Sequence, residues 1–216
     1  MFDSPVWCFP TWKHNNIELP LYQEHRIPQP LLHQHPWMKG HCTKLLEAGC
    51  RIMDIALFNR VYVGFSTYTI CFPEDYPPET TNDRFCWALQ RFIEYNAQYG
   101  ILYVWVREKQ KGTHHHYHLG LWVDYRQIKS MSALGEGFDM FWSSALELLY
   151  TPTGLVHYGD ADRRKVLIRP GEMIEEDYKR MFLLYSYLSK VYTKEYPNTS
   201  GSKRWEFTRI REGHLF

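Results

Sequence analysis

Apolar and polar residues follow two different periods along the chain, and together the periods predict a mixed fold. Stretches 61–72 and 101–109 are rich in β-branched and aromatic residues, which is typical of strands. Segments 39–60 and 171–196 instead have apolar residues at helical spacing. Acidic residues near the start of the second segment and lysines near its end suit the helix dipole. Interspersed strands and helices favour an α+β fold with an antiparallel sheet.

Turn residues predict how these elements are bounded. Thr81 and Asn82 are candidate caps for a helix that ends at Gly100. A turn centred on Lys111-Gly112 joins two strands, so residues 101–124 are expected to form a β-hairpin. The remaining expected elements are a helix over 138–150 and short strands within 154–160, 165–170 and 203–210.

Length and composition predict one globular domain with an extension. The chain has 216 residues, and residues 1–36 show no period, so we expect an irregular N-terminal arm followed by a single domain over 37–216. Five widely spread cysteines without a CxxC motif favour reduced thiols in a cytoplasm. No apolar run approaches the roughly 18 residues of a membrane span, so no membrane partner is expected.

Charge is nearly balanced over the whole chain but not along it. The formal net charge is +1, yet residues 179–211 carry eight Lys or Arg against two Glu. This excess is compatible with a phosphate-binding surface and equally with a solvated helix face and tail.

Four histidines fall between His114 and His118, at the start of a predicted strand. Because side chains alternate along a strand, His114, His116 and His118 share one face. The other face carries His115, Tyr117 and further apolar residues, so it is expected to face the core. Two imidazoles at positions i and i+2 can converge on one divalent ion, and a third ligand must then come from a neighbouring strand.

Glu108 is the candidate third ligand, and the length of the hairpin turn decides its position. A three-residue loop, 111–113, pairs Glu108 with His116 on the same face. A two-residue loop would place Arg107 there and turn Glu108 away, and the sequence does not distinguish the two registers. With the longer loop, Glu108, His116 and His118 form a carboxylate and two-imidazole set that suits Mg²⁺ or Mn²⁺ as well as Zn²⁺.

The long C-terminal helix offers a candidate nucleophile. Tyr187 and Lys190 are three residues apart, so they share a helix face with Lys194. Tyr185 instead belongs to an apolar stripe that is expected to pack in the core. Packing is also the ordinary role of any single helix tyrosine. Tyr192 and Tyr196 form an alternative YxxxY pair, although Pro197 is expected to fray that turn.

These motifs resemble HUH endonucleases, in which two histidines flank a bulky residue on a strand and a helix supplies a tyrosine. The order "HYHLGLWVD", "GLVHYGD", "YSYLSKVYTKEY", "KRWEFTR" resembles the replication proteins of filamentous bacteriophages and of related prophage and plasmid elements. The resemblance covers roughly residues 40–211. One departure is Thr208 after Phe207, where that family tends to carry glycine.

The resemblance implies a central antiparallel sheet of about five strands flanked by helices, as in HUH nucleases. It implies nicking of single-stranded or hairpin DNA at a replication origin in the cytoplasm of a bacterial host, which starts rolling-circle replication. Tyr187 would form a 5′-phosphotyrosine link with help from Lys190, and Mg²⁺ or Mn²⁺ would be the cofactor. No P-loop motif is present, so a host helicase would act in trans. The residues expected to contact DNA are Lys194, Lys203, Arg204 and Arg209.

Two other functions also fit the histidine cluster. A non-catalytic nucleic-acid-binding protein would use the histidines for a structural metal. A nucleotide hydrolase of the histidine-triad type would use His114, His116 and His118, although His115 occupies a position that is apolar in that family.

Overall fold

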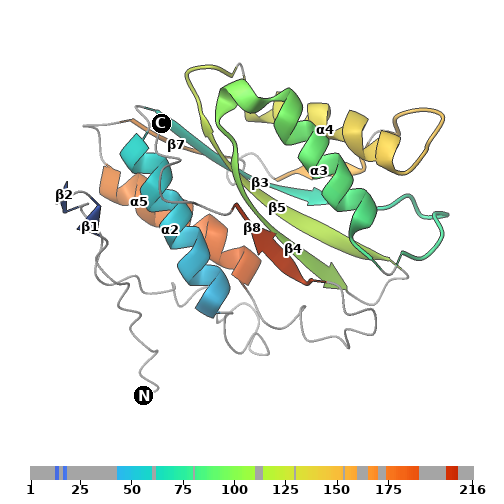
Figure 1. The fold of residues 1–216 in the computed structure, drawn as a ribbon, viewed down its shortest axis with the longest axis horizontal. Helices are drawn as coiled ribbons and strands as arrows, with labels where there is room; N and C mark the ends of the chain where they lie inside the picture. Colours follow the sequence, from blue (N-terminus) through green and yellow to red (C-terminus); the bar gives the residue numbers. More distant parts are fainter. Residues whose placement is uncertain are drawn as a thin grey trace.

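A central antiparallel sheet with helices on both faces forms the body of the protein (Figure 1). The structure is a computed structural model. It describes residues 13–14, 17–18, 43–59, 62–79, 81–109, 114–128, 130–152, 154–159, 165–169, 174–189 and 203–208.

Six strands make up this sheet, in the order β6-β3-β5-β4-β8, with β7 also paired to β3. All the described pairings are antiparallel, as the sequence predicts. A separate pair, β1 (Lys13–His14) and β2 (Ile17–Glu18), lies within the arm for which no element was expected. The strands of the main sheet are β3 (Val63–Ile70), β4 (Leu102–Lys109), β5 (His115–Asp124), β6 (Val156–Tyr158), β7 (Val166–Ile168) and β8 (Trp205–Phe207).

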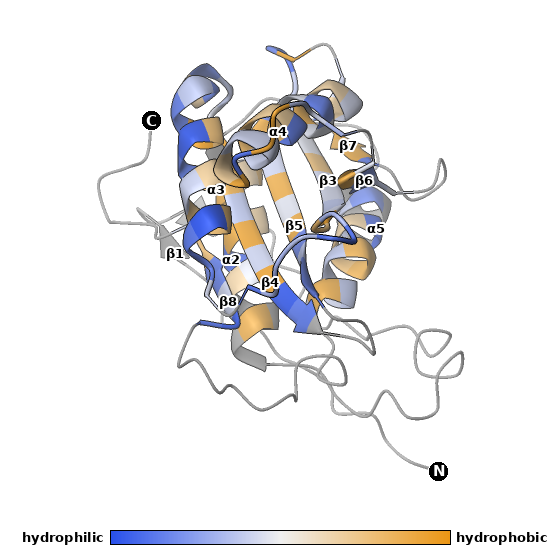
Figure 2. Ribbon diagram, turned by 90° about the vertical axis from the view of Figure 1, so that its right-hand side faces the viewer, coloured by the Kyte–Doolittle hydropathy of each residue, from blue (hydrophilic) through white to orange (hydrophobic). Residues whose placement is uncertain are grey.

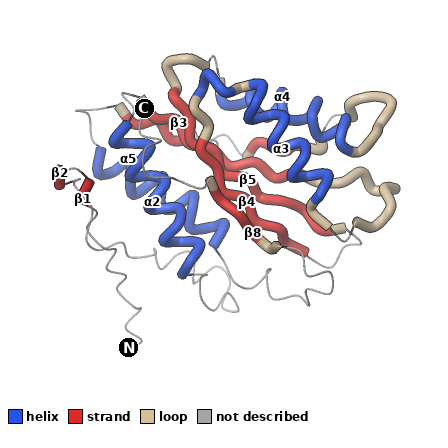
Figure 3. Tube along the Cα trace, in the orientation of Figure 1, coloured by secondary structure: helices blue, strands red, loops and turns tan. Residues whose placement is uncertain are grey.

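The helices lie in two layers, one on each face of the sheet (Figure 3). The first layer consists of α2 (Thr43–Asn59) and α5 (Ile174–Ser186), and the second of α3 (Asp83–Tyr95) and α4 (Met131–Ala145). Short 3₁₀ helices follow two of them, η1 (Ala97–Tyr99) after α3 and η3 (Tyr187–Ser189) after α5. Within the described ranges, every helix is too short or too polar to span a lipid bilayer.

Each face of the sheet therefore carries its own hydrophobic core. Tyr117, Leu119 and Leu121 of β5 pack with α3 and α4, whereas Trp122 packs with α2 and α5. Figure 2 shows the apolar residues along the central strands between the helices. The sequence predicts a core on the Tyr117 face, and that prediction is confirmed. The opposite face, which carries His116 and His118, is also covered over most of its length.

Two helix boundaries differ from the expectation. The helix expected over 138–150 begins at Met131, because Ser130 caps it by accepting a hydrogen bond at Oγ from the backbone N–H of Ala133 (3.1 Å). Gly135 lies in its second turn and interrupts the apolar pattern, so the sequence does not indicate the true start of the helix. This glycine is needed there, since an added Cβ would come within 2.9 Å of the Tyr68 ring.

The C-terminal helix is also shorter than expected in the described part of the chain. It is α-helical over Ile174–Ser186 and then tightens into η3, so Tyr187 lies in a 3₁₀ turn and not in the α-helix. The hydroxyls of Ser186 and Ser189 donate to backbone carbonyls three residues earlier, at 2.8 and 2.7 Å, which favours this tighter winding. The remainder of the expected helix, residues 190–196, lies outside the described residues.

Helices α2 and α5 of the first layer meet at a close contact between Gly49 and Tyr185. The Tyr185 ring of α5 lies against Gly49 of α2, and its hydroxyl donates to the carbonyl of Leu45. A Cβ added at Gly49 would be only 2.0 Å from the Tyr185 ring. The same two helices are joined by a hydrogen bond from the Tyr178 hydroxyl to Asp54 (3.0 Å).

Gly49→Ala is expected to destabilise the protein by about 1–3 kcal/mol or more, because Tyr185 must move out of its packed position. Chemical denaturation monitored by circular dichroism measures the change. Gly137→Ala in α4 is the matched control, since its added Cβ meets its nearest atom, in Phe92, at 3.9 Å. The control is expected to be neutral or stabilising by about 0.5–1 kcal/mol. Equal effects of the two substitutions would contradict the packing argument.

Asp54 is expected to make stability depend on pH. Burial raises the pKa of its carboxyl to about 7, so the folded protein holds a proton that the unfolded chain releases near pH 4. Stability from this group is therefore greatest below about pH 4 and falls as pH rises to about 7. Asp54→Asn, which still accepts the Tyr178 hydrogen bond, is expected to be more stable at pH 8, on the order of 2 kcal/mol.

This difference should shrink toward zero near pH 4, as measured by denaturation at a series of pH values. Asp75→Asn, at an exposed position of the loop after β3, is the control and should show no such trend. A constant difference between Asp54→Asn and wild type at all pH values would contradict the assignment.

Candidate metal centre and tyrosine site

The β4–β5 hairpin has the register that brings Glu108 to the histidines. Glu108 is paired with His116, and Val106 with His118. This is the register expected with the longer loop, so the pairing of Glu108 with His116 is confirmed and the alternative pairing of Arg107 with His116 is wrong. Arg107 is paired with Tyr117 and lies on the opposite face.

The side chains of Glu108, His116 and His118 converge at this end of the hairpin and are called the ligand group below. The Nε2 atoms of His116 and His118 are 3.2 Å apart, and Glu108 Oε2 lies 3.3 Å from His118 Nε2 and 3.9 Å from His116 Nε2. One ligand atom from each residue lies within 4.8 Å of the other two. Two imidazole nitrogens and a carboxylate oxygen in this arrangement are a donor set that fits a divalent cation.

Burial makes this donor set costly without a positive charge nearby. The Glu108 side chain is only 3% exposed, while those of His116 and His118 are 18% and 13% exposed. A carboxylate at such a depth loses most of its hydration, and a cation compensates for that loss. The two imidazoles remain partly open to solvent, so the group can be reached by a ligand from outside.

Thr69 supports the histidines from the other side. It is the cross-strand partner of His118 on β3, and its Oγ1 lies 3.1 Å from His118 Nδ1. When Nε2 binds a metal ion, Nδ1 carries the proton and can donate it in a hydrogen bond to Thr69. Such a contact fixes the orientation of a metal-binding imidazole. The sequence contains no clear signal for this role, because the register between β3 and β5 cannot be read from it.

Tyr187 lies directly beside the ligand group. Its ring meets the His118 ring edge to face, with centroids 6.0 Å apart and planes at 89°. Its side chain is 44% exposed, whereas the next residue, Leu188, is buried. Leu188 packs over Gly120 of β5, where an added Cβ would lie 3.5 Å from it and 3.3 Å from Phe65. Leu188 thus anchors η3 on the sheet, which brings Tyr187 to the histidines.

The other two histidines of the cluster do not join the group. His114 stacks on Phe72, with ring centroids 5.6 Å apart, and its Nε2 lies 3.3 Å from the carbonyl of Glu74. His115 is buried on the opposite face, where its Nε2 lies 2.8 Å from the Tyr117 hydroxyl.

A buried polar network lies behind the histidine strand, on the face toward α3. Asn82 accepts hydrogen bonds at Oδ1 from Arg107 (3.0 Å) and from the Tyr117 hydroxyl (3.3 Å). Its Nδ2 donates to the carbonyl of Lys203 (2.7 Å). Asn82 occupies the N-cap position of α3, as expected, but its side chain makes no capping bond. It joins β4, β5 and the C-terminal segment instead.

The basic residues expected at the site divide into two groups. Lys203 and Arg204 precede β8, and the backbone N–H of Arg107 donates to the carbonyl of Arg204 (2.7 Å). They therefore lie beside the end of β4 that carries Glu108. The other candidates lie outside the described residues, and they are Lys190, Lys194, Arg209 and the alternative nucleophiles Tyr192 and Tyr196.

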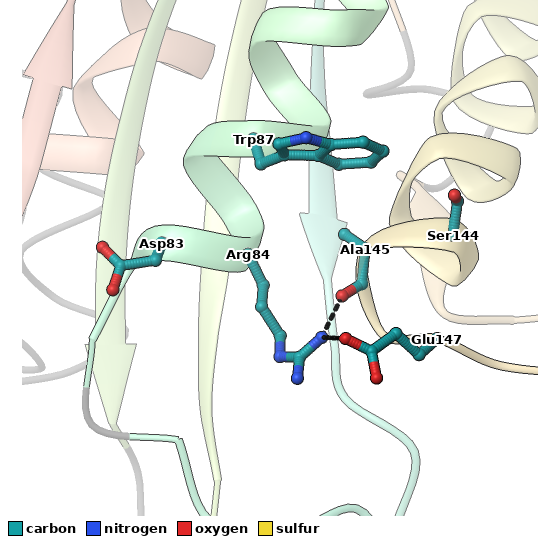
Figure 4. Close-up of a pocket in the computed structure, with 6 residues that line it drawn as sticks. All are labelled: Asp83, Arg84, Trp87, Ser144, Ala145 and Glu147. Atoms are coloured by element: carbon teal, nitrogen blue, oxygen red, sulfur yellow. Dashed lines mark hydrogen bonds and ion pairs between the residues drawn. The ribbon is translucent and has the colours of Figure 1, made fainter.

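A pocket of about 300 Å³ lies elsewhere, in the α3–α4 layer on the far side of the sheet (Figure 4). Arg84 crosses it, donating to Glu147 (3.0 Å) and to the carbonyl of Ala145, while its Nε reaches Glu79 (3.0 Å). These acceptors occupy much of its hydrogen-bonding capacity. The aromatic wall of the pocket is Trp87. The pocket shares no residue with the ligand group.

One family model matches this chain, that of the YagK/YfjJ C-terminal domain, over residues 83–202. The match spans more than half of the chain. The chain belongs to this family. Its matched range includes Glu108, His116, His118 and Tyr187, so all four lie within the YagK/YfjJ C-terminal domain. No curated protein and no solved structure matches the chain.

Thr69→Val is expected to weaken metal binding about 10- to 100-fold, because the valine is similar in shape but cannot accept the His118 hydrogen bond. Titration calorimetry with Mn²⁺ measures the affinity. Thr69→Ser keeps the hydroxyl and should bind like wild type. Thr67→Val is the control on the same strand and face, since its partner across β5 is Gly120 and not a histidine. Wild-type affinity in Thr69→Val would refute the role of Thr69.

Proposed function

We propose that this protein nicks single-stranded DNA at a replication origin, with Tyr187 as the nucleophile and a divalent cation held by Glu108, His116 and His118. The observation that carries the proposal is the position of Tyr187, whose ring packs against His118 of the ligand group. A lone exposed tyrosine has many possible roles, and a position beside a carboxylate and two imidazoles supports a role in chemistry on a phosphate.

The reaction is a transesterification in which bonds are exchanged without net hydrolysis. The Tyr187 phenol oxygen attacks the scissile phosphorus, a 5′-phosphotyrosine bond forms, and the bond to the 3′ oxygen breaks. The phenol loses a proton and the departing 3′ oxygen gains one. The stored phosphodiester can later be attacked by a 3′-OH, so the strand can be rejoined after a round of rolling-circle synthesis.

The residues of the site fit this division of work. Mg²⁺ or Mn²⁺, when bound, would polarise the scissile phosphate and offset its negative charge. A free tyrosine ionises near pH 10, so positive charge near Tyr187 assists the attack. Lys190, three residues later in the chain, is proposed for this role from the sequence. His118 belongs to the ligand group and also contacts the Tyr187 ring, so it joins the two parts of the site.

The wider setting of the proposal comes from the resemblance to filamentous-phage replication proteins. It places the reaction at a single-stranded or hairpin origin in the cytoplasm of a bacterial host, with a host helicase opening the duplex. Lys203 and Arg204, beside the Glu108 end of β4, are the described residues proposed to contact the phosphate backbone, and Lys194 and Arg209 are further candidates.

A histidine-triad nucleotide hydrolase has less support. That chemistry requires a third histidine with the other two, and here His114 stacks on Phe72 instead. The carboxylate that completes the group is Glu108.

Tyr187→Phe is expected to abolish a covalent protein–DNA adduct while leaving DNA binding nearly unchanged, because only the nucleophilic oxygen is removed. The wild-type chain is incubated with Mn²⁺ and single-stranded oligonucleotides that carry candidate origin hairpins, and the adduct is detected as a shifted band on a denaturing gel. His118→Ala and added chelator are also expected to abolish it. Tyr150→Phe, at a tyrosine that is 73% exposed beyond α4, should form the adduct normally.

Two results would contradict the proposal in different ways. An adduct that persists in Tyr187→Phe would move the nucleophile to another tyrosine, with Tyr192 and Tyr196 the first to test. Binding of the oligonucleotides without any adduct, in the presence of bound Mn²⁺, would favour a non-catalytic DNA-binding protein with a structural metal.

A further inference from the structure

The ligand face of the sheet continues past the metal group to the last described strand. Residues paired directly across antiparallel strands point to the same face. His118 is paired with Val106, and Val106 with Trp205. Trp205 is therefore on the same face as His118, two strands away, which corresponds to about 10 Å at the usual strand spacing.

The neighbouring row places a second aromatic ring on that face. Gly120 is paired with Val104, and Val104 with Phe207. The rings of Trp205 and Phe207 are stacked, with centroids 5.8 Å apart and planes only 11° apart. Both residues pack at the margin of the α2–α5 core and both remain partly exposed.

Several contacts hold this aromatic pair in position. The backbones of Tyr103 and Thr208 are hydrogen-bonded at one end of β8, and those of Arg107 and Arg204 at the other. Asn82 holds the carbonyl of Lys203 just before the strand. The aromatic pair is thus fixed relative to the same β4 strand that carries Glu108.

We propose that Trp205 and Phe207 form a stacking subsite for a base of single-stranded DNA, close to the phosphate bound at the metal centre. This inference rests on the proposed function and names how its substrate is held. A flat, partly exposed ring pair suits a nucleobase, since every base offers a π face. Arg204 directly precedes Trp205 and offers positive charge for the backbone, whereas the Lys203 ammonium is paired with Glu206 (2.8 Å).

The geometry explains why a single strand is the ligand. A base stacked on Trp205 while its neighbouring phosphate lies at His118 must be unpaired and splayed from its neighbours. Duplex DNA cannot present a base in this way without melting. The subsite would therefore select strands that are already open, which is the form of the substrate that a nicking tyrosine needs.

The test separates base stacking from charge. Anisotropy of a fluorescein-labelled deoxythymidine oligomer and of an abasic oligomer of equal length is measured with chelator present, so no strand is cut. Trp205→Leu keeps apolar packing but removes the π face. It is expected to weaken binding of the thymidine oligomer about tenfold and to leave abasic binding unchanged. Trp205→Phe should stay close to wild type, and Trp87→Leu, at an exposed tryptophan of α3, should change neither.

A smaller loss with the same base selectivity is expected for Phe207→Leu, which leaves Trp205 in place. Equal losses for both oligomers, or no loss, would overturn the subsite. Adduct formation is scored separately. An adduct through Tyr187 without any base-selective effect of Trp205 leaves nicking standing and refutes the subsite. A base-selective effect without an adduct supports the subsite and contradicts nicking.

Discussion

The pairing of Glu108 with His116 across the β4–β5 hairpin is the constraint on which the rest of the site depends. A shift of one residue would turn Glu108 toward α3 and replace it with Arg107 beside two imidazoles. The same shift would bury an arginine on the ligand face and take Arg107 away from its hydrogen bond to Asn82. The register is therefore selected by both faces at once. On one side it completes a cation site, and on the other it joins Arg107 and Tyr117 to Asn82.

Packing of the two buried residues Tyr185 and Leu188 then brings Tyr187 to that site. Gly49 lets Tyr185 of α5 lie against α2, and Leu188 of η3 packs over Gly120 of β5. Between these two anchored residues the chain has little freedom, so Tyr187 is directed to the rim, where His118 is located. The exposed hydroxyl-bearing ring thus belongs to a segment whose neighbours on both sides are buried. This arrangement combines a firmly positioned backbone with a side chain that is open to solvent.

Much of the fold and part of the site could be predicted from the sequence, for physical reasons that differ between them. Strands such as 101–109 have strong local patterns, and the shared face of His116 and His118 follows directly from strand alternation. Glu108 could be predicted as a ligand in only one of two hairpin registers, because the sequence does not distinguish a two-residue turn from a three-residue turn. Thr69 and Trp205 could not be assigned at all, since their roles depend on pairing between strands that are distant in sequence. Asn82 was assigned a local capping role, but long-range partners take its side chain.

The boundary of the family match has a consequence for how this domain can be divided. The match begins at the first residue of α3, yet β3 precedes it and pairs with β5, β6 and β7. A fragment starting at residue 83 would lack the strand that joins these three. It would expose the open edge of β5, a row of unpaired amides and carbonyls that invites pairing with other chains. The segment that the family model matches is thus shorter than the unit that can fold. A copy of this domain in another protein must therefore include β3.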